Sequence, residues 1–198
     1  KQALIFGIAL SFFSVIALDY FANRISAALL LLTILFYVFV YTIWLKRKTS
    51  QNIVIGGAAG ALPPVIGWTI ATNSLSLEPI TFFLIIFFWT PSHFWALSLY
   101  KSDDYKIAKI PMLPLTNGIE STKINIFVYS LLMLPVIILP YAIGFVSLVF
   151  LVPALMLTFY YNLLCFELYK FKKNKFSAKK AKSIFGYSIL YLFLIFVI

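Results

Sequence analysis

Seven long apolar runs divide this sequence and restrict what it can fold into. They cover residues 3–18, 25–45, 53–71, 80–100, 124–143, 145–166 and 184–198. At a helical rise of about 1.5 Å per residue, most of these runs reach the ~30 Å thickness of a hydrocarbon core, and the first and last are slightly short. None shows the two-residue alternation of a membrane barrel strand. The sequence therefore predicts an all-α integral membrane protein with seven helical spans.

The composition agrees with this class. Apolar residues make up 63% of the chain and charged residues 11%, against about 45–50% and about 25% in an ordinary soluble domain. A soluble protein of 198 residues has no means of burying so much apolar side chain. The single cysteine, Cys165, has no partner within the chain and gives no information on redox compartment. We expect one transmembrane domain over residues 1–198, because no soluble domain or internal repeat interrupts the runs.

The net charge of +10 is distributed by membrane side. If successive helices alternate in direction, the N-terminus and the loops 46–52, 101–123 and 167–183 share one face and hold fifteen of the sixteen basic residues. Only Arg24 lies opposite. Because basic loops stay on the cytoplasmic side, we expect these loops to face the cytoplasm of a bacterial inner membrane, or the matrix if the membrane is mitochondrial. The charge then requires no nucleic-acid partner.

The first basic loop has the composition of an anion site. Lys46 and Arg47 would neutralise a diphosphate, and Asn52 begins the next helix, whose free N–H groups would face the same anion. A basic stop signal beside anionic lipid headgroups is the alternative.

Small residues and prolines follow this loop inside the third run. Gly56 and Gly60 stand four residues apart on one helix face, and the pair Pro63 and Pro64 comes directly after. This segment predicts close helix packing or, alternatively, a broken helix that lines a cavity.

A second polar region begins inside the fourth run. His93 is the only histidine in the sequence, and an ionisable residue at such depth usually faces a cavity or a partner. Asp103 and Asp104 form the only acidic pair, on the same predicted side as the first basic loop. Adjacent carboxylates suit Mg²⁺, which takes one or two of them together with substrate phosphate oxygens. A helix that continued to Asp104 would place this residue on nearly the same face as His93. The alternatives are that His93 is a structural histidine and that the acidic pair lies in a solvated loop.

The last basic loop contains seven lysines between residues 170 and 182, interleaved with Phe171 and Phe176. Such a pattern is typical of a loop or an interfacial helix that binds lipid headgroups. We therefore expect a membrane-surface role for this loop rather than a substrate site.

Several of these strings resemble the heme O synthases, which are the protoheme IX farnesyltransferases of the UbiA superfamily of intramembrane prenyltransferases. The similar strings, in family order, are YT at 41–42, LKR at 45–47 with Thr49, NIVIGGAAGA at 52–61, PP at 63–64, GW at 67–68, PSHFWAL at 91–97, DDY at 103–105 and IPMLP at 110–114. The stretch from DDY to PMLP is the most specific, because it looks like the heme branch rather than the quinone branch. The resemblance implies a UbiA-type bundle of nine helices, seven of them in this chain, with a polar cavity near its cytoplasmic end.

The reaction implied by this resemblance is transfer of a farnesyl group from farnesyl diphosphate to a vinyl group of protoheme IX, with addition of hydroxide, to give heme O. Asp103 and Asp104 are implied as the Mg²⁺ ligands. Lys46, Arg47 and Lys101 are implied as the cations that stabilise the diphosphate as its C–O bond ionises. Membrane lipid and heme A synthase are further expected partners.

The resemblance also suggests residues around the two substrates. Asn52 is expected to contact the diphosphate, and His93 to contact heme either as an axial ligand or through a hydrogen bond. The walls of an apolar channel around the allylic cation are expected from four aromatic residues: Trp89, Phe94, Trp95 and Tyr105.

One family feature is absent. The first acidic motif, an Asn followed by aspartates at four-residue intervals after the second family helix, does not occur here, and the first run looks like the family's third helix. We therefore expect residues 1–198 to be N-terminally truncated and inactive alone.

Other functions stay open at this point. A quinone-precursor aromatic prenyltransferase is the alternative enzyme. A secondary transporter would carry polar residues near the midplane of several spans, whereas here they cluster at one face. A non-catalytic assembly protein gives no reason for basic and acidic loops to meet on one side.

Overall fold

The computed structural model describes residues 1–171 and 177–198, and within these ranges every regular element is a helix. The elements in chain order are α1 (Gln2–Phe21), α2 (Arg24–Leu35), the π-helix η1 (Phe36–Leu45), α3 (Asn52–Ala61), α4 (Pro63–Thr72), α5 (Glu78–Tyr100), α6 (Ser102–Ile107), α7 (Leu113–Thr116), α8 (Gly118–Ala142), α9 (Leu148–Lys170) and α10 (Ala178–Val197).

The predicted spans are confirmed for the described residues. Seven helical segments are long and apolar enough to cross a membrane, with α2 and η1 together forming one of them and α3 and α4 another. Helices α1 and α10 each have 20 residues, so the expectation that the first and last spans are short is wrong. Polar residues at the helix ends, such as Gln2 and the lysines of α10, extend these helices beyond the apolar runs.

Two loops are shorter than predicted. Helix α8 begins at Gly118, so residues 118–123 are helical, and Lys123 is buried with its Nζ 2.7 Å from Glu120 Oε1 and 3.1 Å from the carbonyl oxygen of Phe171. The last predicted loop is helical as far as Lys170 and again from Ala178. Its central lysines and Phe176 lie outside the described residues.

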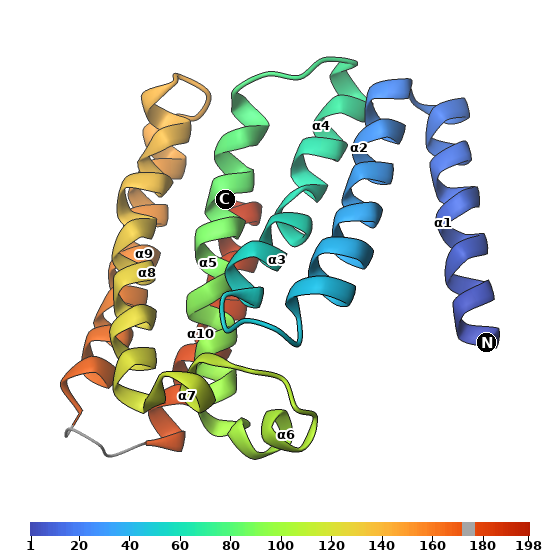
Figure 1. Cartoon of the computed structure of the whole chain (residues 1–198). Coiled ribbons are helices and arrows are strands. Elements are labelled where there is room, and N and C mark those ends of the chain that lie inside the picture. Colours follow the sequence, from blue (N-terminus) through green and yellow to red (C-terminus); the bar gives the residue numbers. More distant parts are fainter. Residues whose placement is uncertain (172–176) are drawn as a thin grey trace.

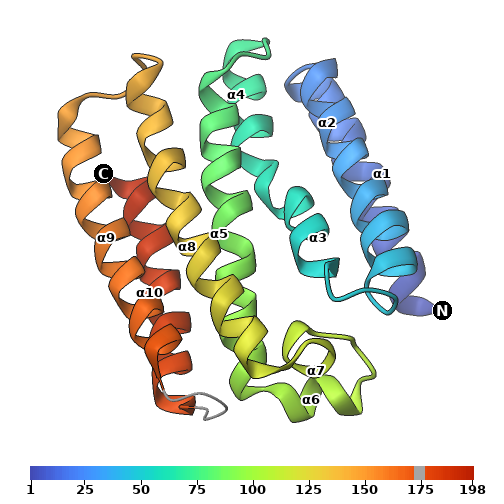
Figure 2. The same cartoon turned by 60° about the vertical axis from the view of Figure 1, so that its left-hand side comes forward.

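Helix α5 lies at the centre of the bundle, in contact with α3, α4, α8 and α10 (Figures 1 and 2). Helices α8, α9 and α10 form the hydrophobic core together with α5. This core includes Ile85, Trp95, Ile126 and Tyr161. Helix α1 packs mainly on α2 and has no buried residue. An apolar helix of this kind is stable beside lipid, because lipid tails cover its side chains as well as protein would.

The polar connections gather at one end of the bundle. The N-terminus, residues 46–51, α6, α7, the end of α9 and the start of α10 lie at this end, which we call the charged end (Figures 1 and 2). The turns after α1, α4 and α8 lie at the other end, which we call the distal end. The predicted grouping of the basic loops on one side is therefore confirmed for the described residues.

The helix break predicted at the proline pair is present. Helix α3 ends at Ala61 and α4 begins at Pro63, and Figure 2 shows the offset between them. The close packing predicted from small residues also occurs, because a Cβ on Gly57 would lie 3.1 Å from the Thr90 side chain of α5. Gly60, in contrast, faces open space. The segment thus packs tightly at its start and borders a cavity at its end.

Candidate functional site

The first basic loop is a tight turn between η1 and α3. Asn52 is buried, and its Nδ2 donates to the carbonyl oxygens of Thr49 at 2.6 Å and Lys46 at 3.3 Å. Both amide hydrogens are therefore used within the loop. The side-chain amide of Asn52 holds the turn in place, and the contact of Asn52 with a diphosphate stays a prediction.

The cations of this turn are available for an anion. Arg47 is exposed and Lys46 is half-buried, with its Nζ 5.8 Å from the centre of the Tyr41 ring. In the described part of the chain, neither forms an ion pair with a carboxylate. The turn therefore presents positive charge next to an aromatic side chain.

The acidic segment lies in α6, at the same end of the bundle as the basic turn (Figure 2). Asp103 and Asp104 occupy the first turn of α6, and both are exposed. Lys101 Nζ lies 3.0 Å from Asp104 Oδ2, and this hydrogen bond, with the charge of Asp104, raises the pKa of Lys101. The basic and acidic predicted residues are thus brought to one end, as expected.

The prediction that His93 and Asp104 share a helix face is wrong. Helix α5 ends at Tyr100, and Lys101 leaves the helical conformation with φ −111° and ψ 22°. A new short helix, α6, begins at Ser102. Because the chain changes direction at Lys101, helical spacing no longer relates the two side chains.

Mg²⁺ fits the acidic pair only as part of a substrate complex. Among the described residues, no group of three or more His, Cys, Asp or Glu side chains is placed to hold a metal ion. The two exposed carboxylates match the one or two that Mg²⁺ usually takes from protein while phosphate oxygens and water complete its shell. The donor set suits a metal–diphosphate complex rather than a closed metal site.

The chain after the acidic pair is anchored under the bundle. Met112 and Leu113 are 1% and 3% exposed, and α7 packs against α5 and α8. Tyr105 is half-buried, and this burial is the largest cause that raises its pKa. The nearby charges of Tyr100 and Asp104 raise the pKa further. The apolar residues of the PMLP string therefore hold in place the segment that carries Asp103 and Asp104.

Two adjoining cavities lie between the α3–α4 break, α5 and their neighbours. The tyrosine cavity, of about 220 Å³, is lined by Tyr37, Tyr41, Ile53, Gly56, Gly57, Gly60, Ile86, Trp89, Thr90 and Phe94. The histidine cavity, of about 620 Å³, is lined by Gly60, Pro63, Pro64, Ile86, Trp89, His93, Ile189, Leu192, Phe193, Phe196 and Val197. Gly60, Ile86 and Trp89 border both cavities, so the two lie next to each other, and we call them together the aromatic groove.

Of the four aromatic residues predicted as channel walls, two line a cavity. Trp89 and Phe94 line the aromatic groove. Trp95 does not, because it is 1% exposed and packs edge-on against Tyr129 in the helix core, with ring centres 5.2 Å apart. Tyr105 lies on α6, outside the groove lining. The sequence analysis missed Tyr37 and Tyr41 as walls, although the YT string carried part of the family resemblance.

His93 is held on three sides. Its ring stacks between Trp89 and Phe185, with ring centres 4.2 Å and 4.5 Å away, and its Nδ1 lies 2.6 Å from Ser188 Oγ. The side chain is 7% exposed and lines the histidine cavity. The sequence analysis missed Ser188 and Phe185, because no local pattern connects α10 with a histidine more than 90 residues earlier.

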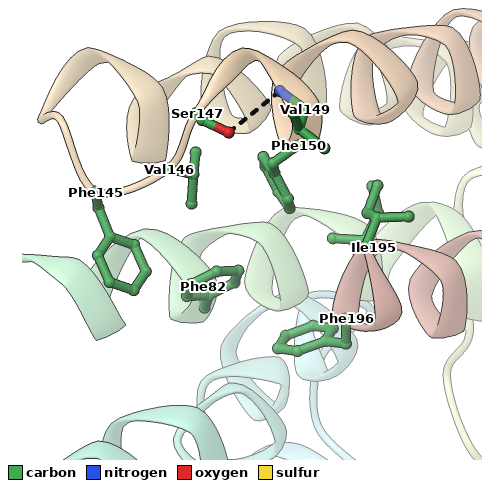
Figure 3. Close-up of a pocket in the computed structure, with 9 residues that line it drawn as sticks. Phe82, Phe145, Val146, Ser147, Val149, Phe150, Ile195 and Phe196 are labelled. Carbon is green, nitrogen blue, oxygen red and sulfur yellow. Dashed lines mark hydrogen bonds between the residues drawn. The ribbon is translucent and has the colours of Figure 1, made fainter.

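A further cavity at the distal end has a different character. This distal cavity has a volume of about 420 Å³ and is lined by Phe82, Phe145, Val146, Ser147, Val149, Phe150, Ile195, Phe196 and Ile198 (Figure 3). Its one hydroxyl, on Ser147, accepts the backbone N–H of Val149 at 3.3 Å and caps α9. None of these lining side chains carries a charge that could serve phosphate or metal chemistry.

Comparisons with known proteins give a consistent result. The UbiA prenyltransferase family matches residues 1–193. A protoheme IX farnesyltransferase of Pelagibacter ubique (strain HTCC1062) is 91% identical over 198 residues, which are all of this chain and 65% of that protein. Proteins with the same name from Parvibaculum lavamentivorans (strain DS-1) and Rhodopseudomonas palustris (strain BisB18) are 50% and 48% identical, over 99% and 100% of this chain and 62% and 63% of their own lengths.

The chain therefore spans a little under two thirds of the length of these curated relatives. No solved structure matches it.

Proposed function

Because the chain belongs to the UbiA prenyltransferase family, we propose that it forms the prenyl-transferring site of a membrane enzyme that moves a farnesyl group from farnesyl diphosphate to a vinyl group of protoheme IX, giving heme O. The observation that carries the reaction class is the placement of the basic turn and the acidic pair at one end of the bundle that also contains the aromatic groove. Protoheme IX is proposed as the acceptor of the farnesyl group because the relatives are named protoheme IX farnesyltransferases.

Diphosphate binding is assigned to the charged end. Lys46 and Arg47 contact the diphosphate, and Asp103 and Asp104 are the residues that would hold Mg²⁺ beside it. When bound, Mg²⁺ supplies positive charge to the phosphate oxygens. Negative charge grows on the leaving diphosphate as the C–O bond ionises, so exposed cations stabilise the transition state more than the ground state. Lys101, paired with Asp104, orients that carboxylate and adds a third cation.

The farnesyl chain is assigned to the tyrosine cavity of the aromatic groove. Ionisation leaves an allylic cation, and the faces of Tyr41, Trp89 and Phe94 attract it by about 0.5–2 kcal/mol each. The apolar lining also excludes water, which would otherwise capture the cation before the acceptor does. The basic turn lies next to this groove, since Lys46 Nζ is 5.8 Å from the Tyr41 ring that lines it.

The same placement supports an orientation in the membrane. We assign the charged end to the cytoplasmic side of a bacterial inner membrane, because nearly all basic residues in the described part of the chain lie there and the relatives are bacterial. Farnesyl diphosphate would then reach the site from the cytoplasm. Heme A synthase is the proposed consumer of the product.

The test uses a chimera in which this chain replaces the matched segment of the Pelagibacter relative. The chimera is expressed in bacteria that lack their own heme O synthase, and hemes are extracted and identified by chromatography with mass spectrometry. We expect heme O. Prenylated aromatic acids without heme O would instead support the quinone-precursor enzyme, and no prenylated product from a folded chimera would contradict prenyl transfer.

A further inference from the structure

The hydrogen bonds around Ser188 define which nitrogen of His93 carries a proton. Ser188 Oγ lies 2.6 Å from the carbonyl oxygen of Phe185 and 2.6 Å from His93 Nδ1. A serine hydroxyl has one hydrogen, and a carbonyl oxygen only accepts. The hydroxyl therefore donates to Phe185, and its oxygen accepts from His93. In this arrangement, Nδ1 carries the proton of the neutral imidazole.

Aromatic contacts fix the ring in this position. Trp89 and Phe185 cover its two faces, at interplanar angles of 21° and 25°. Trp89 is itself fixed, because its Nε1 donates to the backbone oxygen of Ser188 at 2.9 Å. Phe94 also packs edge-on against the ring, with ring centres 5.0 Å apart. Because Ser188 holds Nδ1, Nε2 is the ring nitrogen that remains for another partner.

The histidine cavity gives Nε2 a place to act. His93 Nε2 has no hydrogen-bond partner among the described residues, and His93 lines this cavity. The other lining side chains are apolar apart from Trp89, whose N–H is already bonded to Ser188. The volume of about 620 Å³ is within the range of small-molecule sites. A single basic nitrogen in an otherwise apolar cavity can supply one ligand to a metal ion.

We infer that Ser188 holds His93 in the Nδ1–H tautomer, so that Nε2 offers its lone pair to the cavity and binds the iron of a porphyrin there. The choice of an iron porphyrin rests on the proposed function. Imidazole is a common ligand of iron, and a hydrogen bond from its other nitrogen fixes the tautomer and makes the ligating nitrogen more basic. Ser188 is a positioning residue in this arrangement, and His93 touches the substrate.

The tautomer is measured directly, because the chain has a single histidine. The protein is labelled with ¹⁵N-histidine, reconstituted in phospholipid nanodiscs without porphyrin, and examined by nitrogen NMR. We expect a protonated, pyrrole-type Nδ1 and an unprotonated, pyridine-type Nε2, the reverse of the form that free histidine prefers in water. The reverse assignment, or a fully protonated ring at neutral pH, would overturn the inference.

Binding is tested with ferric protoheme IX on the same preparation. Ser188→Ala is expected to weaken protoheme affinity about tenfold or more and to shift the Soret band, since loss of such a supporting hydrogen bond typically costs about 10- to 100-fold in metal affinity. Ser188→Thr keeps the hydroxyl and is expected to restore both readouts. His93→Gly should lose the histidine-ligated spectrum and regain it when free imidazole is added.

Ser98→Ala is the matched control. Ser98 is fully buried in α5 and donates to the carbonyl oxygen three residues earlier, that of Trp95 at 2.9 Å, as Ser188 does to Phe185. The Ser98 hydroxyl has no histidine partner. We therefore expect no change in affinity or spectrum, and an effect equal to that of Ser188→Ala would contradict the positioning role.

The outcomes separate this inference from the proposed function. Heme O formation by a chimera whose protoheme spectrum does not respond to His93→Gly would overturn the inference and leave the function standing. A histidine-ligated protoheme in a protein that transfers no prenyl group would do the opposite.

Discussion

The histidine cavity and the distal cavity are both bordered by α5 and α10, and both include Phe196, yet their side chains differ in what they can do. In the distal cavity the one hydroxyl is used to cap α9, and the other side chains are apolar (Figure 3). In the histidine cavity one ring nitrogen of His93 has no hydrogen-bond partner among the described residues, and the adjoining tyrosine cavity is lined by Tyr41, which lies beside Lys46 of the basic turn. The comparison teaches that a cavity in a membrane bundle becomes a site through the polar groups held at its edge.

The difference between the two ends of the bundle is tested first by accessibility, where the expected effect is all or none. Single cysteines replace Ser50 or Ser102 at the charged end and Ser74 at the distal end, in a Cys165→Ser background. An impermeant thiol reagent applied to intact bacteria should label only the cysteine at position 74, because the proposed orientation places the basic loops in the cytoplasm. Labelling at position 50 or 102 before lysis would reverse the proposed orientation.

The largest expected effect on turnover comes from the acidic pair. Asp104→Asn in the chimera should lower kcat about 100- to 1000-fold, because in the proposed site it removes a charge that would hold the metal–diphosphate complex while the C–O bond ionises. Asp19→Asn, an exposed aspartate of α1 away from the charged end, should leave kcat unchanged. Equal thermal stability of both variants, measured in detergent, shows that folding is intact. Wild-type kcat in a folded Asp104→Asn protein would remove the metal site from α6.

A smaller effect is expected at the basic turn. Lys46→Ala and Arg47→Ala should each lower kcat/KM for farnesyl diphosphate about tenfold, which corresponds to ~1.4 kcal/mol of lost transition-state stabilisation. Arg24→Ala removes an exposed cation at the distal end and is the matched control. Steady-state kinetics with varied farnesyl diphosphate measure the three variants together. A loss as large for Arg24 as for Arg47 would mean that total charge, not position, matters.

The sequence predicted the parts of this structure that depend on composition along the chain. The length of each apolar run identified the spans, and the asymmetric distribution of lysine placed the loops on one side. The prolines at 63 and 64 predicted the helix break, because a proline nitrogen has no hydrogen to donate to the helix. His93 and the acidic pair were found because charged or ionisable groups are rare near apolar runs.

The parts that depend on three-dimensional packing were not accessible in this way. Trp95 and Trp89 look alike in the sequence, but one packs in the helix core and the other lines the groove. The change of direction at Lys101 broke the spacing argument that joined His93 to Asp104. The contact of Ser188 with His93 depends on the packing of α10 against α5, which the sequence alone does not indicate.

The smallest effect on kcat is expected from a comparison of two phenylalanines, one near each end of α5. Phe94→Ala in the tyrosine cavity should lower kcat a few-fold, since a cation–π contact contributes about 0.5–1 kcal/mol at a partly exposed site. Phe82→Ala in the distal cavity should leave kcat unchanged. Both side chains are partly buried on the same helix, so the thermal stability of the two variants should fall by similar amounts. A greater loss of kcat from Phe82→Ala than from Phe94→Ala would indicate that the reaction takes place at the distal cavity.

Covalent mapping of the prenyl site tests the central claim most directly. A photoreactive farnesyl diphosphate analogue, with a benzophenone group at the far end of the prenyl chain, is bound to the chimera with Mg²⁺, irradiated, and located by peptide mass spectrometry. The account predicts adducts on residues that line the tyrosine cavity, such as Tyr37, Trp89 or Phe94, and their loss when unlabelled farnesyl diphosphate competes. Competed adducts on Phe82, Phe145 or Phe150 of the distal cavity would contradict it.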